Sequence, residues 1–323
     1  MTGGRWRVGV IGTGAMGSSH ARMLARWVPG AEVAVVHDSD RGSAERLGAE
    51  LSAEAAGSAA DLIHAVDAVV IAAPDPTHEE LALACIEAGR PVLCEKPLAV
   101  DVAGAARVVE AEDRAGRPLV QIGFMRRYDP AYVELREAVL GGRVGRPLVV
   151  HCVHRNAVAH PSATSEGIVS NSMVHELDCV PWLLDDPIAA ITVTAPRVEG
   201  MRDPQVALLE TVAGALVTVE VFVNAGYGYD VGCEVVGALG TVRLTPPYGL
   251  ATRLDGVDGS VVGADFVARF ADAYRIELAG WVDGLHRGEV DGPTARDGHR
   301  AAVVAECGVE SLRTGGRVEV PRA

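Results

Sequence analysis

The sequence lacks paired cysteines, long apolar runs and an excess of positive charge, and each absence narrows what the chain can be. Its six cysteines are scattered, with no Cys-x-x-Cys pair and no His/Cys cluster at metal-ligand spacing, which argues against a metal site. The longest apolar runs, such as residues 68–74, have the length of a strand and not of a membrane helix. A net charge of −14 would repel nucleic-acid phosphates. We therefore expect neither a nucleic-acid partner nor a membrane partner.

The remaining composition fits a soluble cytoplasmic protein with two domains. The chain has 323 residues, enough for two sizeable cores, and is 49% apolar and 22% charged. Its first residues include Arg5 and Arg7 but no apolar signal-peptide core. Scattered cysteines are typical of reduced, buried thiols, so we expect a cytoplasmic location.

Residues 7–20 contain the motif around which the chain is organised. An apolar run at residues 8–11 predicts a buried strand, and Gly12, Gly14 and Gly17 follow it at Gly-x-Gly-x-x-Gly spacing. These glycines permit a tight turn, the approach of a pyrophosphate and close packing of the helix expected over residues 18–27. The free amides around the helix start, including those of Ala15 and Met16, would face the diphosphate.

An acidic residue after the second expected strand favours NAD over NADP. A lone glycine motif is weak evidence, but a strand is expected at residues 32–36 and Asp38 stands 21 residues past Gly17. A carboxylate there accepts hydrogen bonds from ribose hydroxyls and repels a 2′-phosphate. The alternative is a solvated turn residue, and the complete βαβ unit favours the cofactor role.

Alternating strands and helices predict a doubly wound parallel sheet, a Rossmann domain over residues 1–123. The expected strands lie at residues 8–11, 32–36, 68–72, 91–94 and 119–122. A ligand would bind at their carboxyl ends. Cofactor contacts are therefore predicted from Ala73, Pro74 and His78 after the third strand, and from Glu95 and Lys96 after the fourth.

Beyond residue 123 the pattern changes to strands joined by short glycine turns. Such strands are expected at residues 148–153, 190–195, 207–213, 215–223, 231–236 and 241–244. Short turns join antiparallel neighbours, so residues 124–323 are expected to form an α+β domain with a large, mostly antiparallel open sheet. Two helices from residue 265 and a strand at 317–320 complete it. Strand 215–223 is apolar on both faces, so one face would pack on helices and the other on a second subunit, or on the chain itself.

Lys96 is the only lysine among 29 basic residues. It lies between Glu95 and Pro97, where a nicotinamide would bind, and Pro97 restricts it to extended geometry and permits a cis bond. Its ammonium could stabilise negative charge developing on a substrate oxygen. One lysine retained in a chain that otherwise uses arginine indicates that arginine cannot replace it there. The alternative is an ordinary surface lysine.

A second group of polar residues surrounds His175. Helical spacing predicts a buried stripe of Met173, Leu177, Val180 and Leu184. Asn171, His175 and Asp178 would share another face, where His175 could act as general base for a hydroxyl proton, or be a buried or capping histidine. Because Pro181 would cost about 3 kcal/mol inside a helix, we expect a kink there or a later helix start.

Arg126 follows the last parallel strand, and His154 and Asn156 alternate onto one face of the next strand. These three residues could bind hydroxyls of a polyol, or make polar contacts between domains.

Taken together, four motifs resemble the Gfo/Idh/MocA family of oxidoreductases, most closely its inositol branch. They are Gly12-x-Gly14-x-x-Gly17-x-x-His20, Glu95-Lys96-Pro97, residues 123–129, and His175-Glu176-Leu177-Asp178. The resemblance covers almost the whole chain. It implies NAD-dependent oxidation of a cyclitol hydroxyl to a ketone, as from myo-inositol to scyllo-inosose. The alternatives are an NAD(P)-dependent aldose dehydrogenase of the same family and a non-catalytic NAD-binding regulatory protein.

The resemblance also implies roles for single residues. His175 would accept the hydroxyl proton, Lys96 would hold the reacting oxygen, and the ring would be gripped by Arg126, His154, Asn156 and Ser172. Members of the family are usually tetramers packed through their open sheets, so a homotetramer or dimer is expected. One departure stands out, because inositol dehydrogenases carry an aspartate four residues before the histidine and this chain has Asn171. An amide cannot stabilise an imidazolium by charge, which predicts a weaker base and a different substrate, such as an amino- or deoxycyclitol or a ketone to be reduced.

Overall fold

The computed structural model describes residues 4–245, 251–260 and 262–321, in two units. The first unit combines Met1–Tyr128 with Asp272–Ala302, and the second combines Asp129–Ala271 with Val303–Ala323. In the described part of the chain, no helix is long and apolar enough to cross a membrane.

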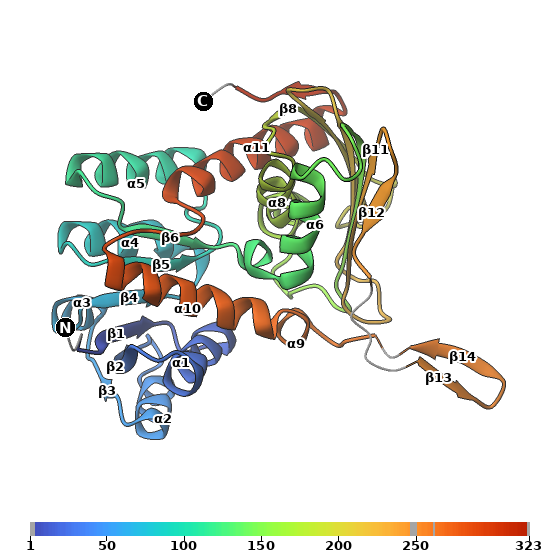
Figure 1. Ribbon diagram of the computed structural model, residues 1–323. Coiled ribbons are helices and arrows are strands. Elements are labelled where there is room, and N and C mark those ends of the chain that lie inside the picture. The colour runs from blue at the N-terminus through green and yellow to red at the C-terminus, as the bar shows by residue number, and fades with distance from the viewer. Residues whose placement is uncertain (1–3, 246–250, 261, 322–323) are drawn as a thin grey trace. The chain divides into compact units, whose positions relative to one another are not determined.

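Six parallel strands form the sheet of the first unit, in the order β3-β2-β1-β4-β5-β6 (Figure 1). The strands are β1 (Trp6–Ile11), β2 (Ala31–His37), β3 (Glu54–Ala55), β4 (Ala68–Ile71), β5 (Val92–Glu95) and β6 (Val120–Gly123). Between them run α1 (Ala15–Trp27), α2 (Arg41–Leu51), α3 (Ala59–Ala65), α4 (His78–Glu87) and α5 (Val102–Ala115), with the short turn η1 (Asp75–Thr77) before α4, and the turn η2 (Met125–Tyr128) follows β6. The predicted doubly wound sheet is confirmed, and its order reverses between β1 and β4, the position where such sheets bind ligands. Strand β3 was not expected, because two residues give no apolar run.

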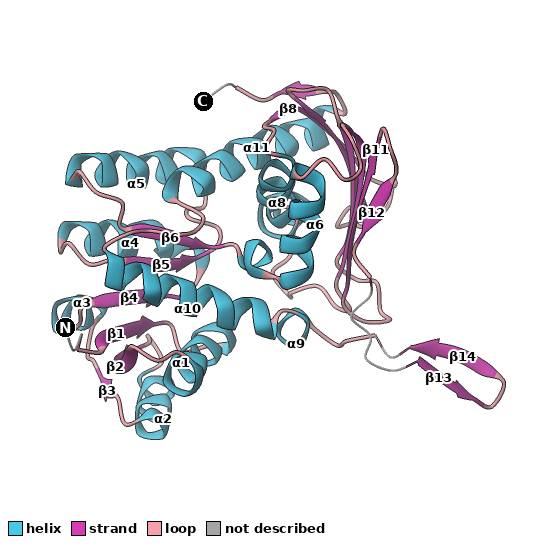
Figure 2. Ribbon diagram, viewed as in Figure 1, coloured by secondary structure: helices cyan, strands magenta, loops and turns pink. Residues whose placement is uncertain are grey.

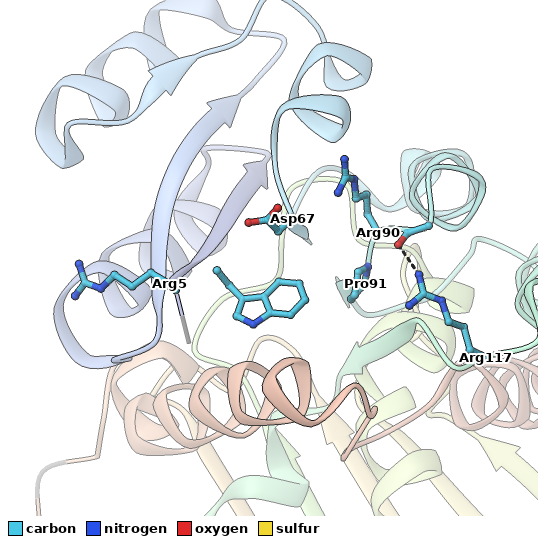
Figure 3. A pocket seen from close by; sticks show the side chains of 8 residues that line it. Arg5, Asp67, Arg90, Pro91 and Arg117 are labelled. Atoms are coloured by element: carbon cyan, nitrogen blue, oxygen red, sulfur yellow. Dashed lines mark hydrogen bonds between the residues drawn. The ribbon is translucent and has the colours of Figure 1, made fainter. Parts of the chain in front are cut away.

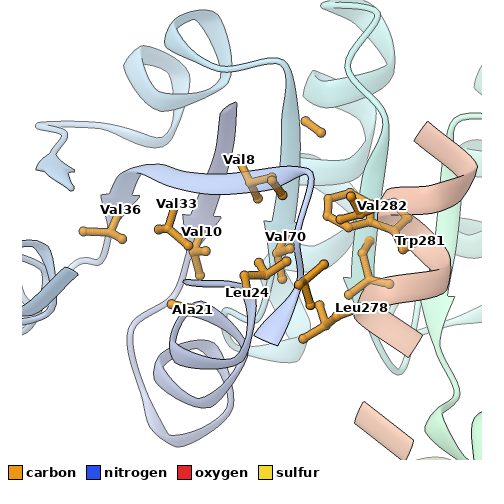
Figure 4. Packing of buried hydrophobic residues seen from close by; sticks show 14 of the residues in the cluster. Val8, Val10, Ala21, Leu24, Val33, Val36, Val70, Leu278, Trp281 and Val282 are labelled. Carbon is orange, nitrogen blue, oxygen red and sulfur yellow. The ribbon is translucent and has the colours of Figure 1, made fainter. Parts of the chain in front are cut away.

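The core of this unit includes a helix from the distant end of the sequence. Val8 and Val10 of β1 are fully buried in a cluster with Leu24 of α1 and with Trp281 and Val282 of α10 (Ala271–Arg287) (Figure 4). On the opposite face of β1, Gly9 lies against a leucine of α3. The sheet is therefore covered on both faces, as its continuous apolar strands require.

Seven strands form the sheet of the second unit, in the order β12-β11-β7-β10-β9-β8-β15. They are β7 (Pro147–Arg155), β8 (Ile188–Thr194), β9 (Gln205–Thr211), β10 (Leu216–Phe222), β11 (Asp230–Gly237), β12 (Thr241–Arg243) and β15 (Val318–Glu319), and β13 (Ala251–Leu254) and β14 (Val257–Ser260) form a separate hairpin. The prediction of a mostly antiparallel sheet is confirmed. The exception is β10, which runs parallel to β7. No short turn joins these two strands, so the rule that predicts antiparallel neighbours does not apply to them.

Helices cover one face of this sheet (Figure 2). They include α6 (Pro130–Leu140), α8 (Val174–Leu184) and the end of α11 (Ala295–Thr314), and the unit also contains α7 (Ser165–Gly167), η3 (Ile168–Ser172) and α9 (Phe266–Arg269). Ser311 of α11 accepts a hydrogen bond from the amide of Val193 in β8. Val217, Val219 and Val221 of β10 are fully buried, whereas Leu216 points away and is 45% exposed.

The helix around His175 differs from the prediction in two ways. It begins only at Val174, after the π-helical turn η3, so Asn171 lies in that turn and His175 in the helix. Residues 173–180 are all buried, the polar ones included. Pro181 is inside α8, and the helix continues to Leu184. The helix does start later than residue 171, but not late enough to leave Pro181 out of its interior.

Candidate functional site

The glycine-rich turn after β1 has the shape of a dinucleotide cradle. Gly12 has φ +91°, in the left-handed region, and a Cβ at this residue would collide with the backbone of Ala72. A Cβ at Gly17 would collide with the Gly12 carbonyl. At Gly14, in contrast, a Cβ would meet no atom of the described chain within 4 Å. Packing explains two of the glycines, and the third is explained by a group that approaches from outside.

Helix α1 starts directly behind this open space. Gly14 is its N-cap and supplies no side-chain hydrogen bond, and the first turn contains no acidic residue. The amides of Ala15, Met16 and Gly17 therefore have no intrahelical acceptor. Together with the positive end of the helix dipole, these donors suit a diphosphate. The structure thus fits the NAD that the sequence predicts.

Replacing Gly14 by alanine should weaken NADH binding at least about tenfold, because the methyl group would occupy the space left for the pyrophosphate. The free energy of unfolding should change by less than about 1 kcal/mol, since φ at this residue is −65° and alanine adopts that value freely. The matched control is Gly17→Ala, which should cost about 1–3 kcal/mol by overpacking. Titration of NADH fluorescence and urea unfolding measure both quantities. Unchanged NADH affinity in Gly14→Ala would contradict the cradle.

Asp38 follows β2 and is held as a carboxylate by donors of the chain. Thr13 donates to its Oδ2 from the amide (2.6 Å) and from the hydroxyl (3.0 Å), and the Asp40 amide donates to Oδ1 (2.8 Å). Burial on its own would raise the pKa of Asp38, but these hydrogen bonds outweigh it and lower the pKa below the usual value. The Ser39 hydroxyl also donates to Oδ1, at 3.4 Å, and as the longest of these hydrogen bonds it is the one that a ribose hydroxyl would replace.

The carboxylate of Glu95, at the end of β5, contacts other groups of the chain. Its Oε1 lies 2.7 Å from Nε2 of His20, a fully buried residue of α1, and its Oε2 accepts the Lys96 amide at 3.3 Å. Burial would raise the pKa of Glu95, but His20 and then Lys96 lower it. Glu95 is therefore an anionic support beside Lys96, with His20 as its partner.

The groups around Lys96 shift its pKa. The Lys96–Pro97 bond is cis, as the sequence allows. Burial lowers the pKa of Lys96 below that of an ordinary lysine; the carboxylates of Glu95 and Asp75 oppose this, and Arg126 adds to it. Arg126, 2% exposed in η2, thus lies near enough to act on Lys96 electrostatically. The ends of β5 and β6 bring these two predicted site residues to one edge of the sheet.

Ala73 and Pro74 follow β4 at the same edge, and His78 opens α4 immediately afterwards. His78 is 1% exposed, and its two ring nitrogens face carbonyl oxygens of Ala73 and Pro97. The ring thus bridges the loops that follow β4 and β5.

In the second unit, His154 and His175 lie side by side. His154, 3% exposed on β7, has its ring centroid 5.9 Å from that of His175 on α8. Its Nδ1 lies 3.3 Å from a carboxylate oxygen of Glu176, which is 1% exposed. Because a carboxylate only accepts, this contact places a proton on Nδ1. Tyr229 packs edge-on against the same histidine at 5.9 Å.

Asn156 follows β7 and carries an orphaned acceptor. Its backbone amide donates to the Phe222 carbonyl at 2.9 Å. Its side-chain Oδ1 is buried, and no donor among the described residues reaches it. A buried polar atom without a partner costs free energy, so this oxygen suits a hydroxyl or amine of a ligand. Asn171 and Ser172 lie in η3, and π turns of this kind are frequent at functional sites.

Sequence reasoning gave no role to several of these residues. Thr13 lies inside the glycine motif, and Glu176 is adjacent to His175, so a search for hydroxyls and carboxylates near the motifs would have found both. Tyr229 is isolated before β11 and has no sequence signal, because its contact with His154 depends on strand pairing.

A cavity of about 390 Å³ lies at the amino ends of the strands of the first sheet (Figure 3). It is lined by residues that precede strands, including Arg5, Asp67, Arg90 and Arg117. Arg117 donates to the Gly89 carbonyl at 2.8 Å, and Asp67 accepts the amide of Arg7. Since open α/β sheets bind ligands at the carboxyl ends of their strands, this cavity is not the candidate site.

Comparison with known proteins agrees with this geometry. Residues 6–124 match the model of an oxidoreductase family with an NAD-binding Rossmann fold, Gfo/Idh/MocA, and residues 136–320 match the model of its C-terminal alpha/beta domain. The chain belongs to the Gfo/Idh/MocA oxidoreductase family.

Relatives within the Gfo/Idh/MocA family match along nearly their whole length. Inositol 2-dehydrogenase 1 of Saccharopolyspora erythraea is 50% identical, over 98% of this chain and 97% of its own. Inositol 2-dehydrogenase of Streptomyces avermitilis is 46% identical, over 98% and 94%. Among solved structures, myo-inositol dehydrogenase from Lactobacillus casei, in complex with NAD(H) and myo-inositol, has a TM-score of 0.94 at 35% identity, covering 99% of this chain and 98% of that one. The family and fold predicted from the motifs are confirmed.

Proposed function

We propose that this protein is an NAD-dependent dehydrogenase that oxidises one hydroxyl of a cyclitol to a ketone, as from myo-inositol to scyllo-inosose, or acts on a related amino- or deoxycyclitol. The observation that carries the proposal is the 46–50% identity to inositol 2-dehydrogenases over 98% of the chain. The glycine cradle, Asp38, Lys96 and His175 supply the groups such a reaction needs.

Different residues of the chain hold the cofactor, accept the proton and stabilise the reacting oxygen. NAD, when bound, accepts a hydride from the substrate carbon. The residues proposed to hold it are Gly12, Gly14, Ala15, Met16, Gly17, Asp38, Ala73, Pro74, Glu95 and Lys96, whereas His78, predicted from the sequence as a further contact, bonds to the loops around them. His175 accepts the hydroxyl proton, and Lys96 donates a hydrogen bond to the reacting oxygen and stabilises its negative charge.

Four further residues are proposed to hold the remaining hydroxyls of the ring: Arg126, His154, Asn156 and Ser172. The unpartnered Oδ1 of Asn156 supports a polar ligand. Asn171 supplies an amide where inositol dehydrogenases carry an aspartate, which favours a substrate other than myo-inositol itself, an amino- or deoxycyclitol or a ketone to be reduced.

We further propose that residues 1–123 bind the dinucleotide, and that residues 124–323, apart from the segment Asp272–Ala302 that packs in the first unit, bind substrate and form a homo-oligomer, a tetramer or dimer. Val206, Leu208 and Leu216 on the open face of the second sheet are 39–45% exposed, which supports packing of that face on a second copy. A cytoplasmic location is supported by six buried cysteines without disulfides.

A substrate panel tests the proposed function. Myo- and scyllo-inositol, an aminocyclitol, a deoxycyclitol and several aldoses are each supplied with NAD or NADP, and the reverse reaction is run with a ketocyclitol and NADH. We expect NAD-dependent turnover of a cyclitol with kcat/KM at least about tenfold above that of any aldose. Preference for an aldose would indicate the sugar dehydrogenase alternative. Tight NADH binding without turnover of any compound would indicate a regulatory protein.

A further inference from the structure

His78 connects two loops at the cofactor edge of the first sheet. Its Nδ1 lies 2.7 Å from the Pro97 carbonyl, and its Nε2 lies 2.8 Å from the Ala73 carbonyl. Ala73 follows β4 and Pro97 follows β5, and these strands are neighbours in the sheet. One side chain therefore fixes the backbone of two neighbouring loops at the carboxyl edge of the sheet, the edge where such sheets bind ligands.

These two contacts require two ring protons. A carbonyl oxygen only accepts hydrogen bonds, and a neutral imidazole has one N–H and one lone pair. With a neutral ring, one of the two carbonyls would face a lone pair in a site that is 1% exposed, which costs the full penalty of an unsatisfied buried group. Only the imidazolium donates to both.

The surroundings of His78 support this charge. Burial on its own lowers the pKa of His78, but the sulfur of Cys94 and the two carbonyls outweigh it and raise the pKa to about 10. Two side chains act on the ring: Cys94 of β5, whose thiol also donates to the Glu95 carbonyl at 3.4 Å, and the neighbouring carboxylate of Glu95.

We propose that His78 is a positioning residue for Lys96, held doubly protonated between the two loops, and not a residue that touches the dinucleotide. Pro97 directly follows Lys96, so the bond to its carbonyl fixes the backbone from which the ammonium projects. Neither ring nitrogen is left over for a ligand. The effect on turnover rests on the proposed function, whereas the protonation state does not.

The protonation state is measured on the full-length protein without substrate. Histidine labelled with ¹⁵N is observed at pH 9, where an ordinary histidine is neutral. We expect one of the ten histidines to keep both ring protons, and its signal to disappear in His78→Asn, or in His78→Gln if the first variant does not fold. If all ten are neutral at pH 9, or if the doubly protonated signal persists in the variant, the proposal is wrong, whatever the enzyme's substrate.

The positioning role is separated from cofactor contact by kinetics. In His78→Asn we expect kcat to fall by about 10²-fold, because a displaced Lys96 loses its alignment. The Kd of NADH should stay within about threefold. His64→Asn, an exposed histidine of α3, is the control and should change neither value. A weakened NADH affinity with unchanged kcat would instead make His78 a cofactor contact and overturn the proposal.

Discussion

Replacing Lys96 by methionine should lower kcat for cyclitol oxidation by about 10²–10³-fold, far more than it weakens NADH binding, with Tm almost unchanged. The ammonium would bind the reacting oxygen most strongly when that oxygen carries negative charge, so its loss affects the transition state more than the bound substrate. Stopped-flow turnover, NADH titration and thermal unfolding give the three values. If kcat is retained while KM rises, Lys96 only binds substrate and the assigned role is wrong.

The variant Lys96→Arg separates charge from shape. Arginine keeps a positive charge but is planar, larger and always protonated. We expect kcat of Lys96→Arg to exceed that of Lys96→Met by less than about tenfold. This outcome would also explain why a chain with 29 basic residues keeps lysine at this one position. Full recovery by arginine would show that position 96 requires only charge.

The pH profile provides a second measurement on the same residue. Burial lowers the pKa of Lys96, so the side chain is fully protonated only below that lowered pKa and loses its charge as pH rises through it. The rate of oxidation should therefore fall on the alkaline side at a lower pH than an ordinary lysine would give. Glu95 raises the pKa of Lys96 and favours the ammonium, so Glu95→Gln should move the alkaline limb further down. In Lys96→Arg this limb should be absent.

The sequence predicted the fold well because local signals determine it. Alternating apolar strands and helices, the glycine spacing and Asp38 are all readable within a short segment, and they describe the first sheet except for β3. The same is true of Lys96, which directly follows a strand. A residue that directly follows a parallel strand lies at the carboxyl edge of the sheet, so its location can be predicted once the strands are known.

Hydrogen-bond partners were not predictable in the same way. His78 was predicted to contact the cofactor, and nothing in its local sequence indicates that carbonyls from two different loops would face its ring. His20 and Glu95 are 75 residues apart, so only the packing of α1 on the sheet makes them partners. Asn171 was expected in one regular helix with His175, but it lies in a π turn, which does not follow the helical repeat.

Replacing His175 by glutamine should lower kcat by about 10²–10⁴-fold, the usual contribution of a positioned general base. Glutamine is polar and of similar size, so the buried end of α8 should remain folded. The matched control is His160→Gln, an exposed histidine of the same unit, which should leave kcat unchanged. An equal loss in both variants would indicate a general effect on the fold.

Converting Asn171→Asp then tests whether this chain uses a weakened base. A carboxylate one turn before His175 would stabilise its protonated ring, so the imidazole would become a stronger base and would lose its proton only at higher pH. The acidic limb of the rate profile should therefore move to higher pH, with slower turnover below the limb and faster turnover above it. Asn171→Leu removes the amide without adding charge and should not move the limb in this direction. If Asn171→Asp changes neither the rate nor the pH profile on any cyclitol, the amide does not set the strength of the base, and the substrate must be distinguished by the residues that hold its other hydroxyls.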